Sequence, residues 1–464
     1  MKKPHLLFIM ADQLRWDAVG EKGSWVNTPN IDRIAREGVL FNHCLTNAPV
    51  CIPARIALAT GQYPHNTGVV RNLPDYDMPS EIPTWMQALR NAGYRTSLFG
   101  KTHLHRHQGD LRDREHLINA YGFDDVDEIG GPRACMWVKS HMTELWERLG
   151  LLDDYIADYN ERFATKAYMA RPSVIPLEHY ADVYVGTKAK AYLERVNDEQ
   201  PWFCMVSFGG PHEPWDAPEP YASMYDPATM PKATLRPPQD ISRPRGHLDT
   251  YLSKGDQHSP DLSEEDVAAM RANYAGMITL IDDQIGEILQ TLEKRGMLDE
   301  TVIIFTSDHG EMNGDYGLIY KETFLNPAIK VPLIIRTPDT IHRSITGTVT
   351  DEMVEMFDIG PTFVELAGGE WNAPYFAKSL LPTIQDADAI HREEALVEVH
   401  GEYLLQTREW KLAVNREGEP YLLFHLAEDP DEQNNLVREA AYKEVVDRLC
   451  IRLLQRLVTS QQQC

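Results

Sequence analysis

Short apolar runs alternate with amphipathic segments along most of the chain. The runs are rich in β-branched and aromatic residues and have the length of buried strands. They lie at 6–10, 95–99, 202–208, 301–306 and 331–335. The segments between them have helical periodicity, at 30–37, 84–92, 182–196, 264–294 and 359–366. Strands that alternate with helices are typical of a largely parallel sheet covered on both faces, so we expect a large α/β domain.

Two long stretches, 104–180 and 214–261, interrupt this alternation. The first is rich in aromatic and charged residues, and the second is rich in Pro, Asp and His. Insertions of this length in a compact domain are usually functional loops or lids. Surface decoration or subunit contacts are the alternative interpretation.

The pattern changes after about residue 369. Short alternating runs with tight connections predict antiparallel strands at 395–399, 403–407, 410–414 and 421–425. An amphipathic helix is predicted at 442–457, and it could pack on its own domain or on a partner subunit. We therefore expect an α/β domain at 1–369 and a smaller α+β domain at 370–464.

Composition narrows the class of protein. The 464 residues are 43% hydrophobic and 25% charged, which is ordinary for a soluble globular protein. A net charge of −25 disfavours nucleic acid and anionic membrane surfaces as partners, because both attract basic proteins. The six cysteines form no C-x-x-C pair, which argues against a zinc ribbon or a redox pair. The apolar run after Lys3 is too short for a signal peptide, so a cytoplasmic location is expected.

The segment from Cys51 to Gly61 combines a helix with candidate chemistry. Pro53 suits the first turn of a helix and Gly61 suits its C-terminal cap, so Cys51 is predicted to lie at a helix N-terminus. Free N–H groups and the helix dipole favour an anion there. Arg55, about one turn further on, offers a fork of donors to a tetrahedral oxyanion. A buried structural cysteine before an ordinary helix is the alternative.

Polar residues follow four of the predicted strands at their carboxyl ends. Ligands of open α/β sheets bind at that edge, so these side chains are expected to converge on one crevice. Each of them alone could be a helix cap or a turn residue. They are Asp12 and Gln13, then Lys101, Thr102 and His103, then His212, and then Asp308 and His309.

The C-x-P-x-R run from Cys51 to Arg55, closed by Thr60 and Gly61, resembles the signature of the formylglycine-dependent sulfatases of the alkaline phosphatase superfamily. The runs after the strands also match this family, as do the Pro-His-x-Pro element at His212 and the downstream Lys321. The resemblance extends from the first strand to about residue 338, and the C-terminal hairpins fit the family's small domain. It implies an alkaline phosphatase/sulfatase-like α/β fold.

The resemblance also implies a divalent metal ion. Asp12, Gln13, Asp308 and His309 would be its ligands, and the family usually holds calcium. Gln13 removes one negative charge from the ligand set and His309 adds a nitrogen, so manganese is an alternative to calcium.

The resemblance further implies that a formylglycine-generating enzyme converts Cys51 to an aldehyde whose hydrate is the nucleophile. His103 would be the base that re-forms the aldehyde. His212 and Lys321 would act on the leaving group, and Arg55 and Lys101 would stabilise charge on the transferred group. Asn72 and Thr102 are weaker candidates for hydrogen bonds to the anion. His105 and His107 form an H-x-H-x-H run with His103, whose spacing could indicate a metal site, but we expect them in a solvated loop.

Three functions are compatible with these residues. The first is hydrolysis of a small-molecule sulfate monoester, favoured by the presence of both Lys101 and His103. The second is hydrolysis of a phosphonate monoester or phosphodiester, because these are tetrahedral monoanions too. The third is a silent anion-binding protein with an unmodified Cys51. The leaving group and the oligomeric state stay open, and a homo-oligomer is allowed.

Overall fold

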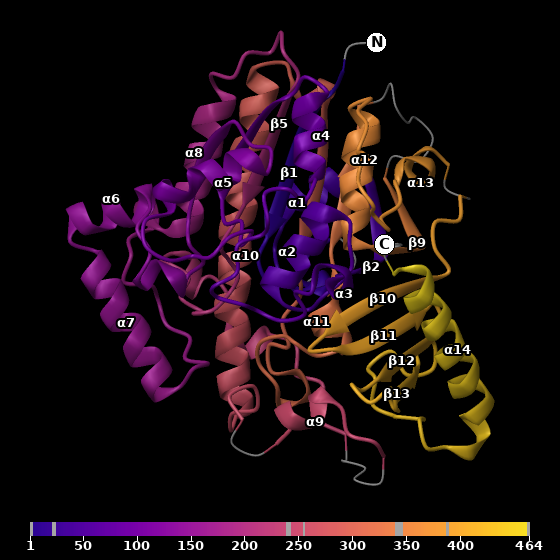
Figure 1. The fold of residues 1–464 in the computed structure, drawn as a ribbon. Helices are drawn as coiled ribbons and strands as arrows, with labels where there is room; N and C mark the ends of the chain where they lie inside the picture. The colour runs from indigo at the N-terminus through magenta and orange to yellow at the C-terminus, as the bar shows by residue number, and fades with distance from the viewer. Residues whose placement is uncertain are drawn as a thin grey trace.

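A mixed sheet of nine strands forms the centre of the molecule (Figure 1). The structure is a computed structural model that describes residues 3–20, 25–237, 243–253, 256–338, 347–386 and 389–461. The strands of the sheet are β1 (His5–Ala11), β2 (Val39–Leu45), β3 (Arg95–Gly100), β4 (Asp125–Glu128), β5 (Trp202–Ser207), β6 (Thr301–Ser307), β7 (Lys330–Val331), β8 (Leu333–Arg336) and β9 (Thr348–Glu355). The helices are α1 (Pro29–Arg36), α2 (Cys51–Thr60), α3 (Pro64–Thr67), α4 (Trp85–Asn91), α5 (Glu115–Ala120), α6 (His141–Leu149), α7 (Leu152–Thr165), α8 (Ala181–Leu193), α9 (His247–Tyr251), α10 (Glu264–Lys294), α11 (Asn326–Ile329), α12 (Ile359–Leu366), α13 (Leu381–Gln385) and α14 (Lys443–Thr459).

The middle of the sheet is parallel. The strands follow the order β4-β3-β5-β1-β6, and each neighbouring pair in this series is parallel. Every residue of β1 is buried, and all of them after His5 are apolar, as expected for a strand covered on both faces. The α/β class predicted from the alternation is confirmed.

The other edge of the sheet is antiparallel in part. β8 runs antiparallel to β6, and β2 runs antiparallel to β7 and β8 but parallel to β9. The single strand predicted at 331–335 is divided into β7 and β8 at Pro332. Proline has no N–H to donate to a ladder, which explains the interruption.

Helices cover both faces of the sheet because side chains alternate along each strand. Leu7 and Ile9 of β1 belong to a core shared with α1, α8 and α10. Leu6 and Phe8 point to the opposite face and belong to a core shared with α2, α4 and α12.

A second sheet of four antiparallel strands lies beside the first (Figure 1). Its strands are β10 (Glu394–Val399), β11 (Glu402–Thr407), β12 (Trp410–Val414) and β13 (Pro420–His425). Leucines of α14 pack on one face of this sheet. The predicted hairpins and C-terminal helix are thereby confirmed.

The two predicted insertions differ in structure. The first contains α5, α6 and α7, and its β4 adds a strand to the large sheet. The second contains α9 and single turns of 3₁₀ helix, and parts of it lie outside the described residues. Among the described residues, no helix combines the length and apolar character needed to cross a membrane.

Candidate active site at the carboxyl edge of the sheet

Cys51 is the first residue of α2 and is 1% exposed. Val50 before it is extended, so the chain turns into the helix at the cysteine. Gly61 ends the helix with φ 64°, and its N–H donates to the Ala57 carbonyl at 2.8 Å. This left-handed cap is the conformation that glycine adopts without strain, so the helix predicted from the sequence is confirmed at both ends.

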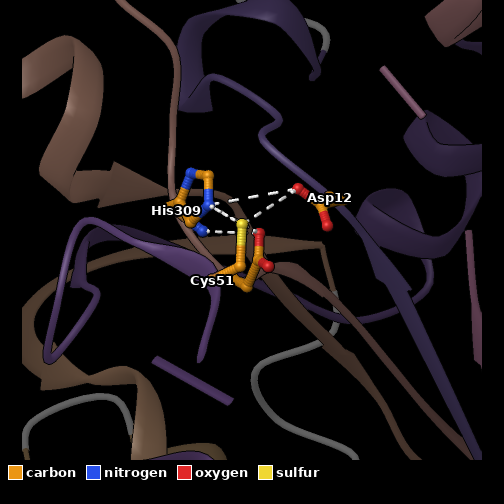
Figure 2. A group of neighbouring side chains, drawn as sticks. Asp12, Cys51 and His309 are labelled. Atoms are coloured by element: carbon orange, nitrogen blue, oxygen red, sulfur yellow. Dashed lines mark hydrogen bonds and ion pairs between the residues drawn. The ribbon is translucent and has the colours of Figure 1, made fainter. Parts of the chain in front are cut away.

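Four buried donor groups surround the start of α2. One ligand atom from each of Asp12, Cys51, Asp308 and His309 lies within 4.8 Å of all the others. The Cys51 sulfur is 3.0 Å from Nε2 of His309 and 3.8 Å from Oδ1 of Asp12, and Figure 2 shows it between these two side chains. Burial lowers the pKa of His309, but Asp308 and Cys51 outweigh burial and raise it to about 9.

Arg55 contacts residues at the ends of four strands, β1, β3, β5 and β6. Its Nε donates to Oδ2 of Asp308 at 2.7 Å, and one Nη donates to Oδ2 of Asp12 at 3.1 Å. Its other Nη donates to the Lys101 carbonyl at 2.7 Å and to Oγ of Ser207 at 3.1 Å. Lys101 also donates from Nζ to Asp12. Burial disfavours the charged form of Asp12, but Lys101 and other nearby cations outweigh burial and hold the pKa of this carboxyl well below its usual range.

The field at Cys51 favours an anion. Burial and the Asp12 carboxylate raise the pKa of the thiol. Lys101, Lys321 and His309 act in the opposite direction and prevail, so the pKa falls to about 6. The position predicted for a nucleophile therefore also stabilises negative charge.

A second group of residues surrounds Lys321. Its Nζ lies 2.9 Å from Nε2 of His212 and donates to the side-chain oxygen of Gln13. The Gln13 amide nitrogen donates to Glu213 at 2.8 Å and also to Glu311. Burial and the charge of Glu213 raise the pKa of Glu311 to about 7. The side-chain oxygen of Gln13 thus faces Lys321.

His103 lies in the same buried region. Burial and the charge of Lys101 hold its pKa well below the usual range, which keeps the ring neutral at neutral pH. Its Nδ1 is buried and has no hydrogen-bond partner in the described part of the chain. The centroid of its ring is 4.5 Å from the centroid of the His107 ring. The Nδ1 nitrogen offers a lone pair for a proton, while burial and Lys101 make the protonated ring short-lived.

Thr102 and Asn72 have other contacts. The Thr102 hydroxyl donates to the buried carboxylate of Glu128. Asn72 is exposed, and its side-chain oxygen accepts the N–H of Ile52 at 3.0 Å, in the first turn of α2. Asn72 thereby occupies one of the free donors at the helix N-terminus.

The expectation that His105 and His107 lie in a solvated loop is wrong. They are 2% and 8% exposed, and both lie against Glu128. Nε2 of His105 is 2.7 Å from one oxygen of this carboxylate, and Nε2 of His107 is 3.4 Å from the other. Their partner Glu128 was not predicted, because it comes from β4, inside a stretch interpreted as an insertion.

The four-donor group suits a divalent cation. Two fully buried carboxylates offer hard oxygen ligands and His309 offers a nitrogen. The neighbouring Arg55 and Lys101 bind the same carboxylates. The buried carboxylates and cations thus lie side by side at the start of α2.

Two family models match the chain. The model described as "Sulfatase" matches residues 4–369. The model described as "N-sulphoglucosamine sulphohydrolase, C-terminal" matches residues 314–459.

Relatives match over nearly the whole chain. An arylsulfatase of Clostridium perfringens is 28% identical, over 96% of this chain and 93% of its own length. A choline-sulfatase of Rhizobium meliloti is 30% identical, over 94% of this chain and 82% of its own. The crystal structure of a phosphonate monoester hydrolase of Agrobacterium radiobacter superposes with a TM-score of 0.77 at 26% identity, covering 99% of this chain and 96% of its own.

Proposed function

The chain belongs to the sulfatase family and is a sulfuric ester hydrolase, and we propose that it cleaves sulfate monoesters with a formylglycine made from Cys51. The position of Cys51 carries this proposal. It begins a helix, lies 3.0 Å from His309, and has its pKa lowered to about 6 despite complete burial. A buried cysteine with only a structural role would not require nearby charges that stabilise its thiolate.

We propose that Asp12, Gln13, Asp308 and His309 hold the divalent cation, with the side-chain oxygen of Gln13 exchanging its contact with Lys321 for the ion. The two carboxylates favour calcium, and the imidazole keeps manganese as the alternative. When bound, the cation would draw electron density from the sulfate oxygens, and the formylglycine would supply the attacking hydroxyl.

The remaining residues would stabilise charge or transfer protons during the reaction. Arg55 and Lys101 contact the carboxylates of the cluster and would stabilise the charge on the transferred group. The pair of Lys321 and His212, whose side chains are in contact, would protonate the leaving oxygen. His103 is neutral and would take the proton of the second hydroxyl when the product leaves.

Two further residues complete the proposed anion site. Asn72 supports the first turn of α2 through its bond to the Ile52 N–H. Thr102 is joined to Glu128 and would reach the anion only if that hydrogen bond were exchanged.

The test is the mass of the peptide that contains Cys51, taken from protein co-expressed with a formylglycine-generating enzyme. We expect the thiol to be replaced by an aldehyde or its hydrate, and turnover of an aryl sulfate to rise with the modified fraction. Cys51→Ala is the control and should lack both. An unmodified thiol in fully active protein would refute the proposal.

A phosphonate monoester or phosphodiester is the second candidate substrate. The likeness to the phosphonate monoester hydrolase favours it, because that structure matches along nearly the whole chain. The kcat/KM values for matched aryl sulfate, phenylphosphonate ester and phosphodiester substrates decide between them. We expect the sulfate to be preferred, since Lys101 and His103 are both present in the site.

A further inference from the structure

Three side chains from distant parts of the chain form a second group of metal-type ligands. We call His247, Glu322 and His400 the mouth cluster. One ligand atom from each lies within 4.8 Å of the other two. Nε2 of His400 is 2.8 Å from the Glu322 carboxylate, and the rings of His247 and His400 are 3.9 Å apart.

Backbone contacts fix two members of the mouth cluster beside the active site. The N–H of Glu322 donates at 2.9 Å to the Pro49 carbonyl, two residues before Cys51. The N–H of His400 donates at 2.9 Å to the Val70 carbonyl, two residues before Asn72.

The third member comes from the second insertion. His247 begins α9, and its N–H donates at 2.7 Å to the Glu402 carboxylate, next to the hairpin turn that carries His400. The cluster therefore brings together residues from three places. These are the second insertion, the segment between β6 and α11 that contains Lys321, and the turn between β10 and β11 of the second sheet.

The polar groups of the mouth cluster are incompletely satisfied. Nε2 of His247 is buried and has no hydrogen-bond partner among the residues that the structure describes. The Glu322 carboxylate accepts from the Tyr251 hydroxyl, which also lies 3.3 Å from Nε2 of His400. A buried imidazole nitrogen without a partner is costly. A cation shared by the three ligands would remove that cost.

We propose that the mouth cluster binds a zinc-type divalent transition-metal ion, distinct from the cation held by Asp12, Asp308 and His309. Two histidines and one glutamate are a ligand set that zinc uses in sites with an open coordination position. Imidazole ligands favour zinc over calcium or magnesium.

The surroundings of the mouth cluster support an open site. The side chains of His400 and Glu322 are 14% and 19% exposed, so an ion has access from solvent. Tyr251 orients Glu322, as residues behind a metal ligand commonly do. The ion would add positive charge to the wall of the active site, one residue from Lys321.

The experiment measures bound zinc in the full-length enzyme after incubation with zinc chloride and removal of the free ion. We expect one equivalent of zinc in the wild type, beyond any in the catalytic centre, and its loss in His247→Ala and in His400→Ala. Tyr251→Phe should weaken zinc binding about 10–100-fold, the usual effect of removing a residue that orients a ligand. His425→Ala is the matched control, because His425 is a half-buried histidine next to a single carboxylate, Glu428.

Asp308→Asn removes a proposed ligand of the catalytic cation but leaves the mouth cluster unchanged. This variant should therefore still bind the zinc of the mouth cluster, which distinguishes the two sites. Substitution with Co²⁺ gives a second readout, a visible absorption band that should disappear in His400→Ala and also in the milder His400→Gln. Circular dichroism identifies any variant that fails to fold. The proposal is overturned if the wild type takes up no extra equivalent, or if folded His247→Ala and His400→Ala retain it. It is also overturned if His425→Ala loses as much zinc as they do.

Discussion

At the residue scale, the thiol of Cys51 is governed by charges from separate loops. Lys101 follows β3, Lys321 and His309 follow β6, and together they outweigh burial and Asp12. Because the pKa is lowered to about 6, the group is a thiol below that pH and mostly a thiolate at pH 7.

This predicts a distinct titration in metal-free protein whose Cys51 is unmodified. The ultraviolet absorbance of the thiolate should rise with pH around a midpoint of about 6, and Cys51→Ala should lack this step. The other cysteines that the structure describes are held protonated, because burial raises the pKa of each. A first step that appears only above pH 8 would contradict the prediction.

Arg55 offers a second prediction at this scale. Arg55→Lys keeps the positive charge but loses the planar fork that joins Asp12 and Asp308. We expect kcat/KM for an aryl sulfate to fall about 10²–10³-fold, the usual effect of removing one donor from an anion-stabilising site. Arg95→Lys is the control, because Arg95 forms an exposed pair with Asp125. A loss below tenfold in the modified enzyme would show that charge alone suffices.

At the scale of elements, hydrophobic periodicity located most of the large sheet. The predicted bounds of 264–294 and 359–366 are those of α10 and α12, because both are long or strongly apolar segments with clear ends. β2, β4 and β9 were missed, and β4 lies inside the stretch interpreted as the first insertion. β2 contains the partly exposed Asn42 and His43, and the first half of β9 is polar, so neither resembles a buried strand.

Part of the candidate site was also predictable from the sequence. Residues placed after strands converge because parallel strands end at one edge, and Asp12, Lys101 and Asp308 do so. Glu311 also lies in the polar run after β6, but its contact with Gln13 was not predicted, and Glu128 ends a strand that was not predicted. Their contacts depend on side-chain packing between segments that the sequence does not bring together.

The end of α2 provides the prediction at this scale. Gly61 and Gly68 both have positive φ, 64° and 74°, so alanine at either should cost about 1 kcal/mol of strain. A Cβ at Gly61 would also meet Trp371 and Tyr375 at 2.8 Å, whereas nothing lies within 4 Å at Gly68. Gly61→Ala should therefore destabilise the protein by roughly 1–3 kcal/mol more than Gly68→Ala in urea unfolding. Equal effects would mean that the aromatic pair moves freely.

At the scale of the whole molecule, the two sheets share a hydrophobic core. One cluster combines Leu45 and Val50 of the large sheet region with Val397 and Leu404 of the small one. The division into 1–369 and 370–464 remains our proposal for the domain organisation, and the second sheet lies wholly within the later part. The shared core means that such domains are not independent in stability.

Hydrogen bonds also connect residues before position 369 with residues after it. Lys411 donates from the small sheet to the Phe324 carbonyl at 3.0 Å, and the Leu396 N–H donates to Glu355 at 2.7 Å. We therefore predict one cooperative unfolding transition for the whole chain, with coincident midpoints by tryptophan fluorescence and circular dichroism. A chain that stops after residue 369 should be insoluble or lack cooperative unfolding, because it exposes the apolar residues that the small sheet covers. Two separated transitions, or a soluble and cooperative 1–369 fragment, would show that each part folds alone.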